Sequence, residues 1–358
     1  MTLHLFVRMH SGTSADYDQH LAALRADPRV RVHDDLAQFL TEPAEHSIAQ
    51  VEINYHHMLD DTEPLLERLS RCHSVIVRSM ENNPHIERLA RRFDLDNFTW
   101  YMPGSPALTR ARHVPNFEWF TSPQYPYFHD AEFVATAWQQ RLRPDRERDH
   151  TFEVMLGVSR PHREFCRQWV QAHVDGGHYL MSPPMTRDTR FDQLPPDSVF
   201  REPEMSPCED FYSVRYLGRT MLQSTVLPVR LYERTQHSVV CETSTDVCFP
   251  TEKTWKPIMA RRLFVVLSCQ GYLRHLRDIG FHTFGDIIDE SYDHEPDDHV
   301  RWRMALEQMH TLTATPWSDL WPGLQPIVEH NLHTLRSLPT QGLLDSLRQA
   351  TAGLEIKG

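Results

Sequence analysis

The residues best suited to chemistry lie in one segment, residues 238–267, which combines carboxylates, hydroxyls and lysines. Glu242 follows an apolar run, and Thr251, Glu252 and Lys253 open a segment of helical character. A helix N-terminus binds phosphate readily because its first amides are unpaired and carry a partial positive charge. A carboxylate at a strand end can accept hydrogen bonds from the two hydroxyls of a ribose. The segment therefore has the side chains that a ribose and a diphosphate need.

The elements that position these residues follow the strand, loop, helix, strand order of a parallel sheet. Residues 238–241 and 263–267 are short apolar runs, and helical character begins near Thr251. Such an order predicts parallel strands joined by a helix. Ligands of parallel sheets bind beyond the carboxyl ends of the strands. We therefore expect Glu242 and the helix start to line one pocket.

The start of this helix has two interpretations. Thr251 is a suitable N-cap, and Lys253 and Lys256 would then add positive charge beside a diphosphate. Pro257 is tolerated in the first turn of a helix but kinks later turns, so a cap at Thr254 is the alternative. The alternative to a ligand site is an ordinary capped surface helix whose charged side chains are solvated.

A second strand and helix repeat the pattern. Residues 151–158 predict a buried strand, and Arg160 and Arg163 lie in the first turn of the helix after it. Two cations at a helix start oppose the helix dipole. An anionic ligand shared with that N-terminus would remove the conflict, whereas two solvated arginines are the alternative.

The whole chain predicts an α/β protein with two Rossmann-like halves. Strands and helices alternate through the first half, and the charged segment 141–150 is the best linker candidate. We expect domains over residues 1–148 and 149–313, followed by a helical tail over 314–358 that braces them.

Composition excludes several classes of protein. The chain has 358 residues, of which 40% are hydrophobic and 24% charged, and its formal net charge is -12. That charge argues against a broad nonspecific nucleic-acid surface. No run reaches the roughly 18 apolar residues of a membrane span, and the first residues lack a signal-peptide pattern. With six scattered cysteines and no CxxC pair, we expect a cytoplasmic protein with reduced thiols.

Metal-binding spacings are also missing from the sequence. The 23 histidines include no HExxH or other recognisable arrangement. The cluster of Asp286, Asp289, Glu290 and Asp293 could bind a divalent cation through oxygen ligands. It lacks the glycine and the spacing of a calcium loop, so a solvated acidic loop is expected.

The segment that begins at Glu242 resembles the donor-binding motif of α1,3-fucosyltransferases. The matching residues are Glu242-Thr-Ser-Thr-Asp246, Thr251-Glu252-Lys253-Thr-Trp-Lys256, Ala260 and the apolar run 264–266. The motif VSRPHRE around Arg160 looks like the arginine-bearing first turn of that family. Residues 280–293 look like a signature of fucosyltransferase-like proteins of phage and bacterial origin. The sequence departs from the family at Thr243, where the family has asparagine, and at Arg261-Arg262, where it has Ala-Gly.

The resemblance implies a GT-B type fold, in which two Rossmann-like domains face a cleft. Residues 1–148 would bind the acceptor, and residues 149–313 a nucleotide-sugar co-substrate, with inversion at the anomeric carbon and with neither a metal nor another cofactor. The acceptor is left open between a glycan, a lipid-linked sugar and a modified DNA base. By position, the implied donor-binding residues are Arg160, Arg163, Glu242, Thr243, Ser244, Thr251, Glu252, Lys253 and Lys256.

The catalytic base and two other functions remain open. Glu52 ends a predicted strand and Glu118 lies in an aromatic segment, while Glu252 is the catalytic candidate near the sugar. Asp60 or His56 would serve equally well as a base. One alternative is a DNA-modifying glycosyltransferase acting on hydroxymethylated bases, which needs a basic, aromatic groove in the N-terminal half. The other is a non-catalytic nucleotide-binding protein.

Overall fold

The structure is a computed structural model that divides into two compact units. The first unit comprises Met1–Ser122 with Pro339–Gly358, and the second comprises Pro123–Leu338. The residues that the structure describes are 2–8, 15–53, 62–79, 98–102, 112–115, 126–128, 130–186, 194–209, 212–246 and 248–338, with residues 344, 347, 348 and 351.

The first unit contains a six-stranded parallel sheet. Its order β2-β1-β3-β4-β5 is that of a flavodoxin-like doubly wound sheet, with β6 added at the edge. The strands are β1 (Leu3–Arg8), β2 (Val30–His33), β3 (Ser47–Ile53), β4 (Ser74–Ser79), β5 (Phe98–Met102) and β6 (Arg112–Pro115). The first half of the chain is therefore α/β, as the alternation of strands and helices predicts.

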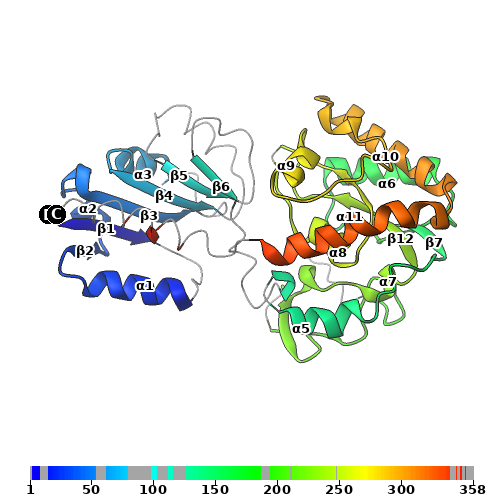
Figure 1. The fold of residues 1–358 in the computed structure, drawn as a ribbon, viewed down its shortest axis with the longest axis horizontal. Helices are drawn as coiled ribbons and strands as arrows, with labels where there is room; N and C mark the ends of the chain where they lie inside the picture. Colours follow the sequence, from blue (N-terminus) through cyan, green and yellow to red (C-terminus); the bar gives the residue numbers. More distant parts are fainter. Residues whose placement is uncertain are drawn as a thin grey trace. The chain divides into compact units, whose positions relative to one another are not determined.

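Both faces of this sheet are covered, as parallel sheets require. Helix α1 (Ala15–Ala26) packs on one face, where Leu24 meets Leu5 of β1. Helix α2 (Leu36–Phe39) covers the other face, and Figure 1 shows the two helices on opposite sides of the sheet. Helix α3 (Thr62–Leu69) joins β3 to β4. Leu344 and Leu347 belong to the α1 core, so the end of the chain packs in the first unit.

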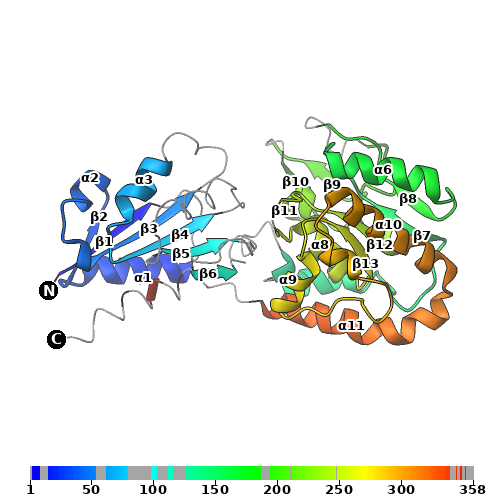
Figure 2. The same cartoon turned by 90° about the horizontal axis from the view of Figure 1, so that it is seen from above.

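The second unit contains a four-stranded parallel sheet in the order β13-β12-β7-β8. Every residue of β12 is buried, as expected for a strand covered on both faces. Figure 2 shows α6 and α11 on opposite sides of this sheet. Helix α10 packs on α6 and β13, and α8 packs on β12 beneath α11. The elements are β7 (His150–Val154), α6 (Pro161–His173), β8 (Tyr179–Met181), β12 (Thr235–Cys241), α8 (Glu252–Met259), β13 (Phe264–Leu267), α10 (Asp298–Ala314) and α11 (Trp317–Ser337).

The strand order creates a switch point between β7 and β12. From β7 the chain crosses through α6 to β8 on one side, while β12 and then β13 lie on the other side. Ligands of open α/β sheets bind at such a point, outside the carboxyl ends of the two strands. The residues that follow β7 and β12 are therefore the place to look for a site.

A small antiparallel sheet adds to the second unit. Strands β9 (Met205–Pro207), β10 (Ser213–Tyr216) and β11 (Arg219–Leu222) form it in the order β11-β10-β9. The proline-rich composition of residues 182–210 predicts a loop, and β9 is the exception within it. The remaining elements of this unit are η4 (Pro126–Phe128), α5 (Ala131–Val134), η5 (Ala135–Gln139), η7 (Gln223–Thr225), α7 (Val229–Tyr232), α9 (Tyr272–Asp278) and η8 (Ser291–His294).

The unit boundaries differ from the expected limits at residues 148 and 313. Phe133, which precedes the charged segment, packs on Tyr216 of β10 and on Trp138, and these residues belong to the second unit. The pattern after residue 314 predicts two helices: residues 317–337 form α11 despite two internal prolines, and residues 344, 347, 348 and 351 are also helical. Residues 83–93, where the sequence pattern predicts a helix, lie outside the described residues. Among the helices that the structure describes, none has the length and apolarity of a membrane span.

The hairpin between β10 and β11 carries a strained residue. Its two-residue loop is Leu217-Gly218, with φ of 47° and 79°. A loop of this kind needs positive φ at both positions and favours Asn-Gly. Leu217 is exposed, so Leu217→Asn should raise the free energy of unfolding by about 0.5–1 kcal/mol, since asparagine tolerates this conformation. Leu217→Ala is the control, because alanine keeps the steric penalty. Equal unfolding midpoints for the two variants in thermal denaturation would contradict this account.

Candidate functional site

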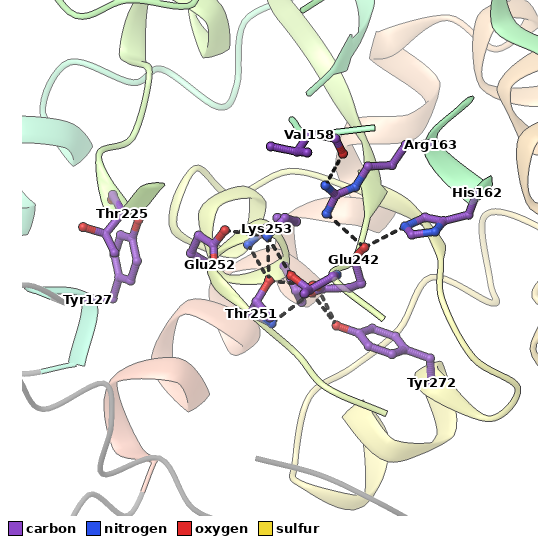
Figure 3. A network of polar contacts seen from close by, with 12 residues as sticks. Tyr127, Val158, His162, Arg163, Thr225, Glu242, Thr251, Glu252, Lys253 and Tyr272 are labelled. Carbon is purple, nitrogen blue, oxygen red and sulfur yellow. Dashed lines mark hydrogen bonds and ion pairs between the residues drawn. The ribbon is translucent and has the colours of Figure 1, made fainter. Parts of the chain in front are cut away.

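Glu242, the residue after β12, is the centre of a buried hydrogen-bond network (Figure 3). Its carboxylate accepts hydrogen bonds from the Thr251 hydroxyl (2.5 Å) and amide (3.0 Å) and from the Thr254 hydroxyl (2.6 Å). The Tyr272 hydroxyl (2.9 Å) and the Thr243 amide (3.2 Å) complete the set. Five donors fill the acceptor positions of a carboxylate. Burial and the charge of Glu242 raise the pKa of Tyr272, which keeps its hydroxyl a donor.

This network gives Glu242 a different role from the one expected. Its side chain is fully buried, and its oxygens are occupied by protein donors, so they do not offer the ribose contact that the sequence predicts. The carboxylate instead ties the loop after β12 to the start of α8 and to α9. It thereby positions the residues around it.

Thr251 is the N-cap of α8, as the first of the two interpretations predicts. Its backbone is extended, and its hydroxyl accepts a hydrogen bond from the Lys253 amide. Thr254 is not the cap and lies inside the helix. Pro257 falls in the second turn, where its missing N–H leaves the helix without one internal hydrogen bond.

The backbone carbonyl of Glu242 accepts hydrogen bonds from α6, the helix that follows β7 on the other side of the switch point. His162 Nε2 donates to it over 2.8 Å, and Arg163 donates to it over 3.2 Å and to the Val158 carbonyl over 2.7 Å. Arg163 is buried, so this guanidinium ties together the ends of two strands and does not face solvent. Gly157, just before Val158, has a φ of +63°, a left-handed conformation that favours glycine.

His162 is one of the site residues that sequence reasoning missed, as are Tyr272 and Glu153. The pKa of His162 is lowered to about 4, chiefly by burial and with a smaller contribution from the charges of Arg163, Arg160 and Lys253, while the hydrogen bond to the Glu242 carbonyl opposes the shift. The imidazole is therefore neutral at pH 7 and can donate to the Glu242 carbonyl. A histidine directly after the N1 proline of a helix was the available signal. Arg163 shares the Glu242 carbonyl with His162, and the charges of Arg160 and Lys253 also act on the imidazole.

Two cations lie at the surface of this cluster. Arg160 is the exposed N-cap residue of α6, and it forms no ion pair with any residue that the structure describes. The Lys253 ammonium, in the first turn of α8, donates to Glu252 (2.6 Å), Thr243 (3.0 Å) and Thr251 (3.4 Å). Each cation therefore sits at a helix N-terminus, where the helix dipole repels it and attracts anions.

Two further ionisable groups, Lys256 and Glu153, are buried. Burial lowers the pKa of Lys256 to about 8, partly offset by the charge of Glu252, and the Lys256 side chain forms no hydrogen bond or ion pair within the described part of the chain. Burial raises the pKa of Glu153, on β7, to about 7. Burial also opposes ionisation of Glu252, but Lys253 and Lys256 outweigh it and leave the pKa of Glu252 lowered. Glu153 was not predicted, although a lone carboxylate within an apolar strand is a recognisable signal.

Ser244 and the departures from the fucosyltransferase motif have structural roles. The Ser244 hydroxyl accepts a hydrogen bond from the Asp246 amide, which closes a local turn. Arg261 adopts a left-handed φ of 55° after α8 and pairs with Glu329 of α11 over 3.0 Å. Arg262 is buried and donates to the Tyr232 carbonyl over 2.8 Å.

The candidate bases of the first half cannot be placed in the same way. Glu52 lies on β3, but its side chain is outside the described residues, as are Glu118, Asp60 and His56 in full. The side chains expected to line a DNA groove also lie outside them. The structure therefore adds nothing for or against these roles.

The acidic cluster of residues 286–293 forms caps and does not form a solvated loop throughout. Asp293 is buried and accepts the Leu273 and Arg274 amides at the start of α9 (2.8 and 2.9 Å). Glu290 accepts from the Thr283 hydroxyl and the Phe284 amide (2.7 and 2.6 Å). These two carboxylates therefore position the start of α9 and the segment after residue 282.

Comparisons with known proteins give little beyond this geometry. No protein-family model and no curated protein matches the chain. Among solved structures, an α1,3-fucosyltransferase is similar over 93% of this chain and 90% of its own, at 10% sequence identity and a TM-score of 0.38. A likeness at this level assigns neither fold nor function, so both rest on the chain's own contacts.

His162 provides a test of the network through pH. Its pKa is lowered from 6.5 to about 4, so its contribution to stability is complete above pH 6.5 and is lost as the pH falls to 4, by up to about 3 kcal/mol. His162→Gln keeps a donor for the Glu242 carbonyl but does not titrate. Its unfolding midpoint should fall less between pH 6.5 and 4 than that of the wild type. The exposed His310→Gln is the control, and identical pH profiles for all three proteins would contradict the assignment.

Proposed function

We propose that the protein is a glycosyltransferase that moves a sugar from a nucleoside diphosphate donor to an acceptor hydroxyl. The observation that carries the proposal is the pair of cations, Arg160 and Lys253, at the N-termini of α6 and α8 on either side of the sheet's switch point. Switch points bind nucleotides, and helix N-termini bind phosphate. The motif shared with α1,3-fucosyltransferases supports the same donor class.

The charges of the cluster favour a dianionic ligand. Arg160, Arg163 and Lys256 form no ion pair with a carboxylate among the described residues, and Lys253 is balanced by Glu252. Glu242 adds a second negative charge, so four cations are set against the carboxylates of Glu242 and Glu252. The cluster therefore has an excess of positive charge, which a diphosphate would neutralise.

The chemistry follows from placing the diphosphate at these two helix starts. The acceptor oxygen bonds to the anomeric carbon as the bond from that carbon to the phosphate oxygen breaks, and its proton passes to a base. The leaving nucleoside diphosphate keeps the electron pair of the broken bond, and Arg160, Lys253 and the helix amides stabilise its charge. Attack opposite the leaving group inverts the anomeric carbon.

Glu252 fits a binding role better than that of a general base. Its pKa is lowered, so it stays ionised and accepts hydrogen bonds from hydroxyls of the ribose or of the sugar. Glu52 and Glu118 remain the candidates for the base. The acceptor, whether a glycan, a lipid-linked sugar or a modified DNA base, is not defined by this cluster.

Nucleotide binding tests the proposal directly. A calorimetric screen of nucleoside diphosphates should find one that binds the wild type, and Arg160→Ala and Lys253→Ala should each raise its Kd by about tenfold or more through loss of a charged contact. Arg303→Ala on α10 removes the same charge from an exposed ion pair and should leave Kd unchanged. Equal affinities for all four proteins would end the assignment.

Turnover separates the transferase from the other functions. Release of nucleoside diphosphate from a nucleotide sugar, followed with and without candidate acceptors, is expected in the wild type and reduced in Lys253→Ala. Tight nucleotide binding without turnover against any acceptor would instead indicate a non-catalytic nucleotide-binding protein. Turnover that requires hydroxymethylated DNA would identify the DNA-modifying alternative.

Lys256 should show a conflict between stability and binding. The pKa of this buried group is lowered to about 8 from 10.5, so it destabilises the fold fully below pH 8, by up to about 3 kcal/mol, and the effect disappears by pH 10.5. Lys256→Met should therefore raise the unfolding midpoint at pH 7 while weakening nucleotide binding. Lys253→Met, which loses three hydrogen bonds, should not raise it. A lower midpoint for Lys256→Met would contradict the assignment.

A further inference from the structure

We propose that the first unit contains a binding site for a zinc-class divalent cation, formed by His4, His33 and Glu42. The Nδ1 atom of His4 lies 3.1 Å from Nε2 of His33 and 3.4 Å from Oε2 of Glu42. Nε2 of His33 lies 3.9 Å from Oε1 of Glu42. Both histidines are buried, at 8% and 3% exposure. This site is independent of the function proposed above.

The parallel pairing of β1 and β2 brings the ligands together. In this pairing Phe6 is opposite His33, and because side chains alternate along a strand, His4 and Phe6 share the face that carries His33. Phe39 of α2 packs on both Phe6 and His33. The turn after α2, in which the Glu42 amide donates to the Phe39 carbonyl, then places the carboxylate beside the two rings.

The distances match the edges of a metal coordination shell. Zinc binds histidine nitrogen and carboxylate oxygen at about 2.0–2.2 Å in a tetrahedral arrangement, which sets neighbouring ligand atoms about 3.3–3.6 Å apart. The three separations, 3.1, 3.4 and 3.9 Å, all lie within a few tenths of an ångström of this range. The two that involve Glu42 are to different oxygens, so a small rotation of the carboxylate is needed to present one oxygen to the ion. An ion at the centre would therefore require little movement of the buried rings.

The ligand types favour a borderline metal with one open position. Two imidazoles and one carboxylate suit zinc and its neighbours better than calcium or magnesium, which prefer oxygen ligands. Three protein ligands leave the fourth position to water or to a ligand. The Glu42 side chain is 20% exposed, which gives the ion a path from solvent.

Arg31 is the competing cation at this place. Its guanidinium lies 3.8 Å from Oε1 of Glu42, but its side chain is 58% exposed, and an exposed pair of this kind contributes little. A hydrogen bond between the two imidazoles, with Glu42 as acceptor, is the arrangement that would hold the cluster without metal. The metal site and the metal-free hydrogen-bonded cluster make different predictions: only the metal site binds one ion per untagged chain through these residues.

Metal binding by the untagged full chain distinguishes them. After treatment with a chelator and dialysis, the wild type should bind one Zn²⁺ per chain with an affinity above that of adventitious histidines. It should also give a tetrahedral Co²⁺ absorption band and a higher unfolding midpoint with Zn²⁺ present. His4→Gln and His33→Gln should each weaken binding by more than about tenfold, because even loss of an outer-shell partner costs that much.

The exposed His73→Gln is the matched control and should bind as the wild type does. Circular dichroism of each variant checks that it is folded, and Glu42→Gln, at a partly exposed position, tests the site if a histidine variant does not fold. Loss of the Co²⁺ band in Glu42→Gln but not in His73→Gln would support the site. Equal Zn²⁺ affinity in the wild type, Glu42→Gln and every folded histidine variant would overturn it.

Discussion

The buried carboxylate of Glu242 is the constraint on which the rest of the site depends. A charge removed from water destabilises a fold unless it is fully hydrogen-bonded. Here the donors come from the loop after β12, from the start of α8 and from Tyr272 of α9. Because these donors must all reach the Glu242 carboxylate, its hydrogen bonds hold the loop and the first turn of α8, which carries Lys253, in place. His162 and Arg163 fix the same residue through its carbonyl and link it to α6.

Local signals in the sequence predict the elements well. The bounds of α1, β2 and β5 agree with the apolar patterns, and Thr251 caps α8 as its type and position indicate. Each of these depends on residues within a few positions of one another, where propensity and capping decide the outcome. Placing Arg160 and Lys253 at helix starts follows from the same local rules.

The roles within the site depend on contacts that local patterns do not contain. His162 meets Glu242 across 80 positions, and Tyr272 meets it across 30. Arg163, expected to face a diphosphate, binds two carbonyls instead, and Glu242 binds protein donors instead of ribose. His4 and His33 lie 29 positions apart, so strand pairing and not sequence spacing creates their cluster. Motif spacing detects sites within one element and misses those assembled between elements.

The two cations and the buried network are the basis of the anion site that we propose at the edge of the parallel sheet. Its central claim is that a diphosphate lies against the starts of α6 and α8. A crystal structure of the protein with the nucleoside diphosphate that binds it best is the most direct measurement. The account predicts density for the two phosphates in contact with Arg160 and Lys253 and with the first amides of α8. Well-ordered nucleotide elsewhere, with both side chains facing only solvent, would contradict it.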